Sequence, residues 1–319
     1  MRVITAAEID GALSFPALIE ALAEAFRGAF VAPPRHHHTI AGEGAPATLL
    51  LMPAWTDAGR GGFVGVKTVS VFPDNGRRGL PSVFGTYLLM SGDTGEPLAA
   101  LDGTRLTLWR TAAASALAAS RLARDDTTSM VMVGAGALAP FLIRAHCAVR
   151  PIARVALWNH RPEKADRLAA TLAGEGLPVG ATRDLEAAVR AADILSCATL
   201  TTTPLVRGAW LKPGAHLDLV GAFNLAMREA DDEALQRARV YIDTPAAKTE
   251  GGDVALGLKS GAIRESDLKG DLFALCRGVV PGRTNRDEIT LFKSIGAAIE
   301  DLAAAMLVWR GVQAPVCKS

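Results

Sequence analysis

The sequence predicts an α/β protein, and two patterns in its second half carry this prediction. Short apolar runs rich in β-branched residues alternate there with helix-like segments, which is typical of a parallel sheet with helices on both faces. One of these runs, Ser129–Val133, leads directly into Gly134-Ala-Gly136-Ala-Leu-Ala139 and a further helix-like segment. Strand, glycine turn and helix in this order form the layout of a dinucleotide phosphate-binding turn. We therefore expect a Rossmann-type doubly wound parallel sheet.

The glycine turn suits a pyrophosphate for steric reasons. Gly134 permits the tight turn, Gly136 lets the backbone approach the phosphates, and the small Ala139 lets the helix pack closely on the strand. The N–H groups of the helix N-terminus, around Ala137 and Leu138, would bind the pyrophosphate. The alternative is an ordinary loop, because glycine and alanine are abundant in this chain.

The end of the next predicted strand, Arg154–Trp158, indicates which dinucleotide binds. An NAD site usually places a carboxylate about 20 residues after the glycines, where it binds the ribose 2′-OH. Here the strand is followed by Asn159, His160 and Arg161, and the first carboxylate is that of Glu163. A neutral and basic strand end suits a 2′-phosphate, so we expect NADP(H) to be preferred, although NAD(H) also fits. The alternative is that Arg161 is only a solvated charge.

Composition and charge limit the class of protein. The chain has 319 residues, enough for two domains, and its 50% of hydrophobic residues can form a sizeable core. Its net charge of +1 gives no support for a nucleic-acid or membrane-surface partner. The four cysteines lack zinc-binding spacing, and no long uncharged apolar stretch predicts a membrane-spanning helix. The N-terminus carries acids where a signal peptide needs an apolar core, so we expect a cytoplasmic protein. We also expect no metal.

The first part of the chain predicts a smaller α+β domain. Thr5 and Glu8 have the spacing of a capping box at a helix start. Strand-like runs separated by hairpin signals follow and favour a mainly antiparallel sheet: Thr48–Met52, Phe63–Val71, Val83–Met90 and Pro97–Leu101. An Ala-rich helix, Thr111–Leu122, then leads into the glycine-turn domain.

Strand and helix signals alternate from there to the C-terminus. Three more strands are expected after the glycine turn, at Ile194–Ala198, His216–Val220 and Arg239–Ile242. The last helix is amphipathic and can return to the first domain. We expect a substrate-binding and dimerisation domain at residues 1–112, joined by the C-terminal helix 295–319, and a dinucleotide-binding domain at residues 113–294.

Three basic residues of the first domain are candidate substrate ligands. Lys67 shares the face of a predicted strand with Val69 and Val71, where a charge is costly unless it is paired or faces a ligand. Arg110 lies at the expected start of a helix, where a cation opposes the helix dipole and fits better beside a bound anion. The structural alternatives are an edge-strand lysine and a surface arginine.

Arg35 is the third candidate. It precedes His36-His37-His38, which cannot all face one metal, so we expect a polar loop near the substrate and no metal site. Basic side chains beside a nicotinamide indicate a substrate with a carboxylate. We expect Lys67 and Arg110 to be needed for turnover and not for the fold.

The chain resembles the ornithine cyclodeaminase/μ-crystallin family over essentially its whole length. The resemblance is carried by Pro34-Arg35, Leu51–Pro53, Gly65–Val71, Leu108–Ala113, the Gly134 turn and Ile289–Gly296. It implies a dimer built through the first domain and an active site between the domains.

The resemblance also implies roles for individual residues. The substrate-carboxylate ligands of the family match Arg35, Lys67 and Arg110. The segment beside the cofactor matches Thr111, and the loop that approaches the nicotinamide matches Ser294 and Gly296.

One departure from the family pattern indicates which of the family's reactions to expect. Ornithine cyclodeaminases carry Gly-Gly-Asp after the strand that corresponds to His216–Val220, and this Asp handles the substrate amine. This chain has Val220-Gly-Ala-Phe223 there, and Leu138 replaces a common Gln. It therefore resembles the branch that reduces cyclic imino acids: Δ1-pyrroline-2-carboxylate to L-proline and Δ1-piperideine-2-carboxylate to L-pipecolate. Phe223 would offer an apolar wall to the substrate ring.

Two alternatives stay open. The first is another enzyme of the family, an ornithine cyclodeaminase or an alanine dehydrogenase-like enzyme. The second is a non-catalytic, μ-crystallin-like protein that binds NADPH and a small ligand.

Overall fold

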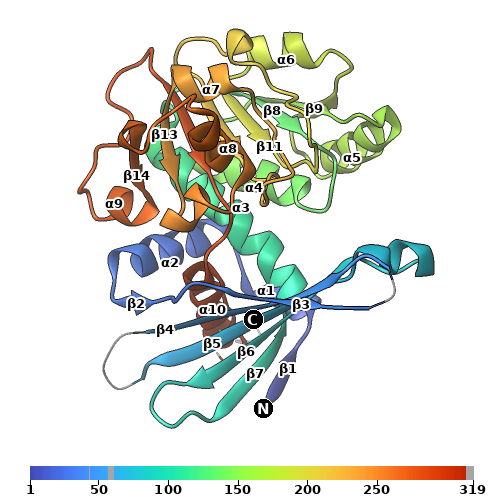
Figure 1. Ribbon diagram of the computed structural model, residues 1–319, viewed down its shortest axis with the longest axis vertical. Helices are drawn as coiled ribbons and strands as arrows, with labels where there is room; N and C mark the ends of the chain where they lie inside the picture. The colour runs from blue at the N-terminus through green and yellow to red at the C-terminus, as the bar shows by residue number, and fades with distance from the viewer. Residues whose placement is uncertain (43, 57–60, 314–319) are drawn as a thin grey trace. The chain divides into compact units, whose positions relative to one another are not determined.

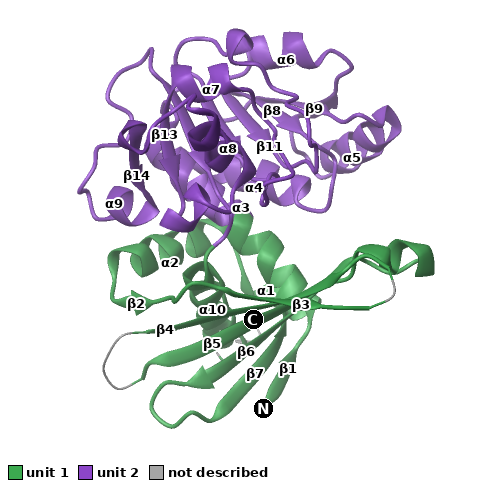
Figure 2. Cartoon of the chain, viewed as in Figure 1, with its two compact units in different colours: residues 1–111, 297–319 green, residues 112–296 purple. Residues whose placement is uncertain are grey.

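The computed structural model describes residues 1–42, 44–56 and 61–313 (Figure 1). The chain divides into two compact units (Figure 2). Unit 1 combines residues 1–111 with the residues from Ala297 onward, and unit 2 contains residues 112–296. The helix expected at residues 295–319 is observed at Ala298–Gln313 (α10), and residues 314–319 lie outside the described part of the chain.

Unit 1 is built on a mainly antiparallel sheet, as the hairpin signals predict. The strand order is β1-β7-β6-β5-β4-β2, and β3 also pairs with β4. The strands are β1 (Arg2–Ile4), β2 (Phe30–Val31), β3 (His36–Ile40), β4 (Ala47–Thr56), β5 (Phe63–Val71), β6 (Val83–Ser91) and β7 (Pro97–Asp102). The sequence predicts β5 to the residue and misses β1 and β2, which are too short to show a clear hydrophobic alternation. The polar loop expected at Arg35 and His36-His37-His38 is wrong, because the three histidines begin β3.

The helices α1 (Ala6–Ala12), α2 (Phe15–Arg27) and α10 also belong to unit 1. The capping box before α1 is confirmed, because Thr5 accepts from the N–H of Glu8 while the Glu8 carboxylate accepts from the N–H of Thr5 at 2.9 Å. Helix α10 packs against α2 and against β4, β5 and β6. This central position explains why every residue from Ala298 to Ala305 is buried.

Unit 2 is built on a parallel sheet, which confirms the predicted α/β class. The strand order is β10-β9-β8-β11-β12-β15-β13-β14. The strands are β8 (Ser129–Val133), β9 (Arg154–Trp158), β10 (Val179–Ala181), β11 (Ile194–Cys197), β12 (His216–Leu219), β13 (Ala238–Ile242), β14 (Leu268–Asp271) and β15 (Ile289–Lys293). The order reverses between β8 and β11, and such switch points are where doubly wound sheets bind ligands.

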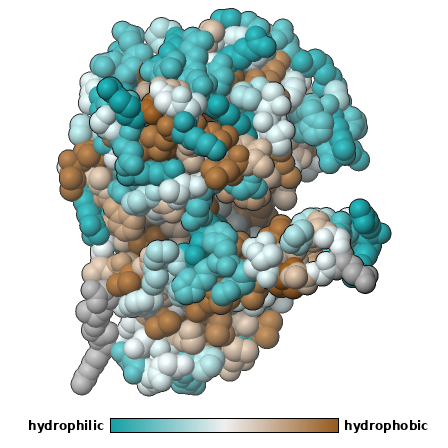
Figure 3. Space-filling view, viewed as in Figure 1, coloured by the Kyte–Doolittle hydropathy of each residue, from teal (hydrophilic) through white to brown (hydrophobic). Residues whose placement is uncertain are grey.

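The helices of unit 2 bury their apolar faces and leave polar faces outside. They are α4 (Ala139–Val149), α5 (Pro162–Gly174), α6 (Leu185–Ala191), α7 (Asp232–Arg237), α8 (Gly252–Ser260) and α9 (Leu272–Cys276). In α5 the buried residues are Ala165, Ala169 and Leu172, four and three positions apart. The surface over α5 and α6 is accordingly hydrophilic (Figure 3).

Helix α3 (Gly103–Leu122) begins in unit 1 and ends in unit 2. It starts at Gly103, so the start expected near Thr111 is wrong. A Cβ on Gly103 would lie 2.7 Å from the carbonyl carbon of Gly85 in β6, and this close approach requires glycine. Arg110 is therefore in the middle of the helix, and the predicted conflict with the helix dipole does not arise.

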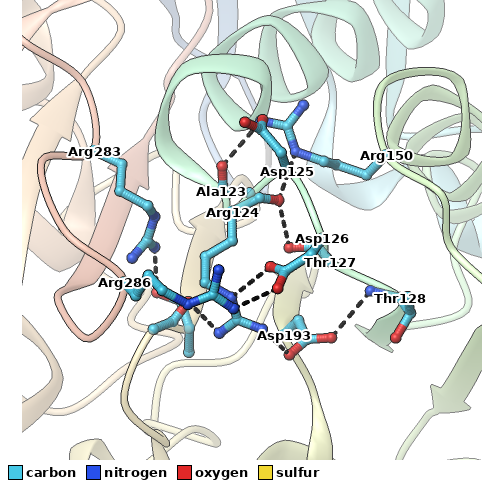
Figure 4. A network of polar contacts seen from close by, with 12 residues as sticks. Ala123, Arg124, Asp125, Asp126, Thr127, Thr128, Arg150, Asp193, Arg283 and Arg286 are labelled. Carbon is cyan, nitrogen blue, oxygen red and sulfur yellow. Dashed lines mark hydrogen bonds and ion pairs between the residues drawn. The ribbon is translucent and has the colours of Figure 1, made fainter.

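Arginine side chains hold the C-terminal end of α3 (Figure 4). Arg150 donates at 2.8–3.0 Å to three carbonyl oxygens near the helix end, those of Ser120, Ala123 and Arg124. Arg283 donates to the carbonyl oxygen of Leu122 at 2.7 Å. Carbonyl groups at a helix end lack intrahelical donors, and cations there are favoured by the helix dipole. The network lies by the amino end of β8, so it stabilises the opposite edge of the sheet from the glycine turn.

Candidate active site

A buried cluster of four charged side chains lies in unit 1. Lys67 of β5 forms an ion pair with Asp301 of α10, with 2.7 Å between Nζ and Oδ2. Arg110 of α3 donates from Nε to Asp301 at 3.1 Å and from Nη1 to Glu300 at 2.7 Å. Lys67 is 2% exposed, Arg110 is 5% exposed, and both carboxylates are fully buried. Charges are tolerated at such depth only when they are paired.

This geometry corrects both structural alternatives for the cations. Strand β5 lies between β4 and β6, so Lys67 is not an edge-strand lysine. Arg110 is buried and ion-paired, so it is not a surface arginine. Thr111, the next residue of α3, is also buried. Because Lys67 and Arg110 neutralise buried acids, we infer that they also stabilise unit 1, contrary to the expectation that they serve turnover alone.

The sequence reading missed Glu300 and Asp301. Both lie in the first turn of α10, where acids are favoured by the helix dipole. The signal that could have found them is a pair of adjacent acids in an otherwise largely apolar segment. Two acids on a buried helix require cationic partners, and Lys67 and Arg110 are those partners.

The ammonium of Lys67 has a pKa below its ordinary value. Burial and the positive charge of Arg110 lower the pKa of Lys67 to about 8, while Asp301 and Glu300 act in the opposite direction. A lysine with such a pKa can hold a proton at neutral pH and release it readily. The cluster therefore places an arginine that binds carboxylates beside a lysine with a lowered pKa.

The sheet of unit 1 aligns further candidate residues with Lys67. Met52 and Tyr87 lie directly opposite Lys67 on the two neighbouring strands. His36 pairs with Leu51, so continuing this register by one residue places the half-buried Arg35 in the same row. Tyr87 is fully buried, and its hydroxyl oxygen has no hydrogen-bond partner in the described part of the chain. A Cβ at Gly65 would overlap this hydroxyl, so glycine is required beside it.

The glycine turn of unit 2 has the properties that a dinucleotide requires. It follows β8 at the switch point of the sheet, and Gly134 has a φ of 109°. A Cβ on Gly134 would lie 2.7 Å from the carbonyl oxygen of Ala198, so this position needs glycine. At Gly136 a Cβ would meet nothing within 4 Å, which leaves the backbone open to a ligand. Ala137 is exposed and Leu138 is the N-cap of α4, so the residues present fit a pyrophosphate.

The segment after β9 consists of one neutral residue, Asn159, and two basic residues, His160 and Arg161. The Asn159 side-chain oxygen accepts from the N–H of Ala135 at 3.2 Å and so connects this segment to the glycine turn. His160 and Arg161 are exposed, and Arg161 is the N-cap residue of α5. The first carboxylate after the strand belongs to Glu163.

The segment after β15 is held by a buried carboxylate. Asp243 accepts from the N–H groups of Ile295 and Gly296, each at 2.7 Å. Gly296 has a φ of 81°, a left-handed conformation that favours glycine. Ser294 is buried, and its hydroxyl has no hydrogen-bond partner in the residues that the structure describes. This segment is therefore rigidly placed at the carboxyl end of the sheet.

Phe223 follows β12 at the same edge of the sheet and is 50% exposed. An exposed phenylalanine at the ligand-binding edge of a parallel sheet is unusual for a packing residue. It offers an apolar surface without any charge.

Metal binding and membrane insertion find no support in the described residues. There, no group of three or more His, Cys, Asp or Glu side chains is placed to hold a metal ion. His36, His37 and His38 lie exposed along β3. Among the described helices, none is both long and apolar enough to cross a bilayer.

Known proteins are similar to this chain over nearly its full length. It is 42% identical over 309 residues to Protein SAR DEFICIENT 4 of Arabidopsis thaliana, covering 92% of this chain and 94% of that protein. It is 39% identical over 313 residues to the Delta(1)-pyrroline-2-carboxylate reductase of Paracoccus denitrificans, covering 95% and 94%.

A solved structure agrees with these relatives. The Delta(1)-pyrroline-2-carboxylate reductase of Thermococcus litoralis, solved in complex with NADH and L-proline, has a TM-score of 0.91 and 32% identity, covering 98% of both chains. The model of the ornithine cyclodeaminase/mu-crystallin family matches residues 2–314. The chain therefore belongs to the ornithine cyclodeaminase/mu-crystallin family.

Proposed function

We propose that this protein is an oxidoreductase that uses a nicotinamide cofactor to reduce cyclic imino acids. The substrates are Δ1-pyrroline-2-carboxylate, which yields L-proline, and Δ1-piperideine-2-carboxylate, which yields L-pipecolate. The buried pairing of Lys67 and Arg110 with Glu300 and Asp301 carries the proposal, because it holds an arginine that binds carboxylates beside a lysine whose pKa is lowered to about 8. The reductases of Paracoccus denitrificans and Thermococcus litoralis support it by their similarity.

Arg110, Lys67 and Arg35 bind the substrate carboxylate in this proposal. The guanidinium of Arg110 suits a carboxylate because its N–H groups form a planar fork. Lys67 has three N–H donors, and its ammonium is held by the ion pair with Asp301. The two acids keep both cations charged and oriented before the substrate arrives, so little reorganisation is needed on binding.

Lys67 also supplies the proton of the reaction. Protonation of the imine nitrogen makes the neighbouring carbon electrophilic and leaves an amine after reduction. A bound nicotinamide supplies the hydride. The lowered pKa of Lys67 matches this role, because a general acid is most effective when its pKa is close to the working pH.

Phe223 stands at the position where ornithine cyclodeaminases carry an aspartate, and in this proposal it lies beside the substrate. Its exposed ring offers contact to the methylene groups of a cyclic substrate. It cannot accept a proton or a hydrogen bond from an open-chain amine, so the deamination of ornithine lacks its carboxylate. This residue favours reduction of a cyclic imine over cyclodeamination.

We further propose that the cofactor is NADP(H) in preference to NAD(H). Ala137, Leu138 and the glycines of the turn bind the pyrophosphate, while the exposed His160 and Arg161 lie where a 2′-phosphate would be recognised. Thr111, Ser294 and Gly296 contact the nicotinamide end. The Thermococcus litoralis reductase was solved with NADH, so the preference is a property to test in this chain.

A homodimer formed through unit 1 completes the proposal. Phe72, Leu80, Val83 and Phe84 are exposed around the connection between β5 and β6. Clustered apolar side chains on one sheet extension are typical of a subunit interface. Light scattering, which measures mass in solution, tests this assembly.

The proposed reaction predicts which substrates turn over. NADPH oxidation should be rapid with the five-membered or the six-membered cyclic imino acid and slower with pyruvate plus ammonia. Ornithine with oxidised cofactor should release little ammonia, because Phe223 stands in place of the required carboxylate. Ammonia release from ornithine without any imine reduction would return the protein to the cyclodeaminase reaction.

The pKa of Lys67 predicts the pH dependence of imine reduction. Because burial lowers this pKa to about 8, the ammonium is present below that pH and lost above it. The value of kcat/KM should therefore fall by roughly tenfold per pH unit above this pKa. Lys67→Arg, which stays charged, should remove the inflection while lowering the rate. An identical inflection in both proteins would assign the titration to another group, such as the substrate imine.

The basic edge after β9 predicts cofactor selectivity. The wild type should show a higher kcat/KM with NADPH than with NADH. Arg161→Ala should erode this preference by about tenfold, as expected for the loss of one charged contact to a phosphate. Arg167→Ala, an exposed arginine further along α5, is the matched control and should leave the preference unchanged. A wild type that uses NADH equally well or better would contradict the assignment.

A further inference from the structure

Two loops at the ligand-binding edge of unit 2 are joined by one buried carboxylate. Glu229 is fully buried and accepts from the N–H of Thr199 at 2.7 Å and from the hydroxyl of Thr199 at 2.8 Å. Its other oxygen accepts from the N–H groups of Gly221 at 2.7 Å and Ala222 at 3.3 Å. Thr199 follows β11, and Gly221 and Ala222 follow β12. Glu229 thus connects the two loops across neighbouring strands.

The two loops are also in direct contact. A Cβ on Gly221 would overlap the carbonyl oxygen and the N–H of Thr199, so only glycine fits between them. The N–H of Arg228 donates to the carbonyl oxygen of Thr201 at 2.9 Å, a further hydrogen bond between the segments that follow β11 and β12. The position of each loop is therefore coupled to that of the other.

Glu229 is itself fixed by a second buried acid. Asp253 accepts through Oδ1 from the N–H groups of Glu229 at 2.7 Å and Ala230 at 3.1 Å. Its other oxygen lies 3.2 Å from the ammonium of Lys293, which is fully buried at the end of β15. Burial raises the pKa of Glu229, while the positive charge of Lys293 lowers it and the negative charge of Asp253 raises it. Keeping this carboxylate buried is costly, and nothing in the proposed chemistry yet uses it.

Each of the joined loops carries an exposed apolar side chain. Leu200 is 70% exposed next to Thr199, and Phe223 is 50% exposed next to Ala222. Large apolar side chains at the carboxyl edge of a parallel sheet are placed to contact a ligand. The residues that donate to Glu229, Thr199 and Ala222, directly precede Leu200 and Phe223 in the chain.

We propose that Glu229 is a positioning residue that sets the selectivity for substrate ring size by fixing Phe223 relative to Leu200. The inference rests on the proposed function, since the substrate ring is what Phe223 would contact. One methylene in an apolar site changes kcat/KM by roughly 10- to 200-fold, so a shift of Phe223 should be visible as a change in ring preference.

The test compares the five-membered and six-membered cyclic imino acids in Glu229→Gln. The amide would present a donor to backbone N–H groups, so it breaks the connection without a large change of shape. The ratio of the two kcat/KM values should change by about fivefold or more. This ratio does not depend on how much of the protein is folded. Glu233→Gln, an exposed residue of α7, is the matched control and should leave the ratio unchanged. Glu229→Asp is measured in the same way if Glu229→Gln does not fold.

A double mutant shows whether Glu229 acts through Phe223. In a Phe223→Ala background, Glu229→Gln should no longer change the ratio, because the side chain that it positions is absent. An unchanged ratio in the single variant, or an equal change in both backgrounds, would overturn the proposal.

Hydrogen exchange separates this inference from the proposed reaction. In Glu229→Gln the amides of residues 199–203 and 220–224 should exchange at least about tenfold faster than in wild type and in Glu233→Gln. If the wild type reduces neither imine, the proposed function fails, and these exchange rates alone decide whether Glu229 holds the loops. Unchanged exchange would then refute the positioning role.

Discussion

The site in unit 1 depends on the pairing of two buried cations with two acids from the C-terminal helix. Lys67 and Arg110 could not remain charged at their depth without Asp301 and Glu300, because removing an ion from water costs several kcal/mol even after relaxation. The pairing leaves the four side chains with no net charge when all are ionised. In the proposed function, a substrate carboxylate would meet cations that are already oriented, so helix α10 would be as much a part of the site as the sheet.

In unit 2, two buried carboxylates accept hydrogen bonds from backbone N–H groups. Glu229 accepts from the loops after β11 and β12, and Asp243 accepts from the segment after β15. These N–H groups are therefore unavailable to a phosphate. At Gly136 the backbone is open instead. In the proposed function, this contrast would direct a dinucleotide phosphate to the glycine turn and leave the other loops to the substrate end.

The sequence predicts those parts of the protein that depend on local pattern. The alternation of β5, the strand and turn at Gly134 and the capping box at Thr5 are all read from neighbouring residues. Long-range pairing escapes this reading, because nothing near Lys67 in the chain reveals that its partner is Asp301. Strand β15 is also missed, although all five of its residues are buried. The start of α3 is misplaced because Gly103 fits a close contact with Gly85 that only the fold creates.

The central claim is that the Lys67–Arg110 cluster binds the substrate carboxylate. The most direct test is the Kd of L-proline, measured by calorimetry in the presence of oxidised cofactor, for wild type, Glu300→Gln and the double variant Arg110→Met/Glu300→Gln. The double variant removes a cation together with its acid partner, so no buried charge is left alone. Proline binding should weaken by at least about 30-fold relative to Glu300→Gln, while the cofactor Kd stays within about twofold. Unchanged proline binding in the folded double variant would contradict the account.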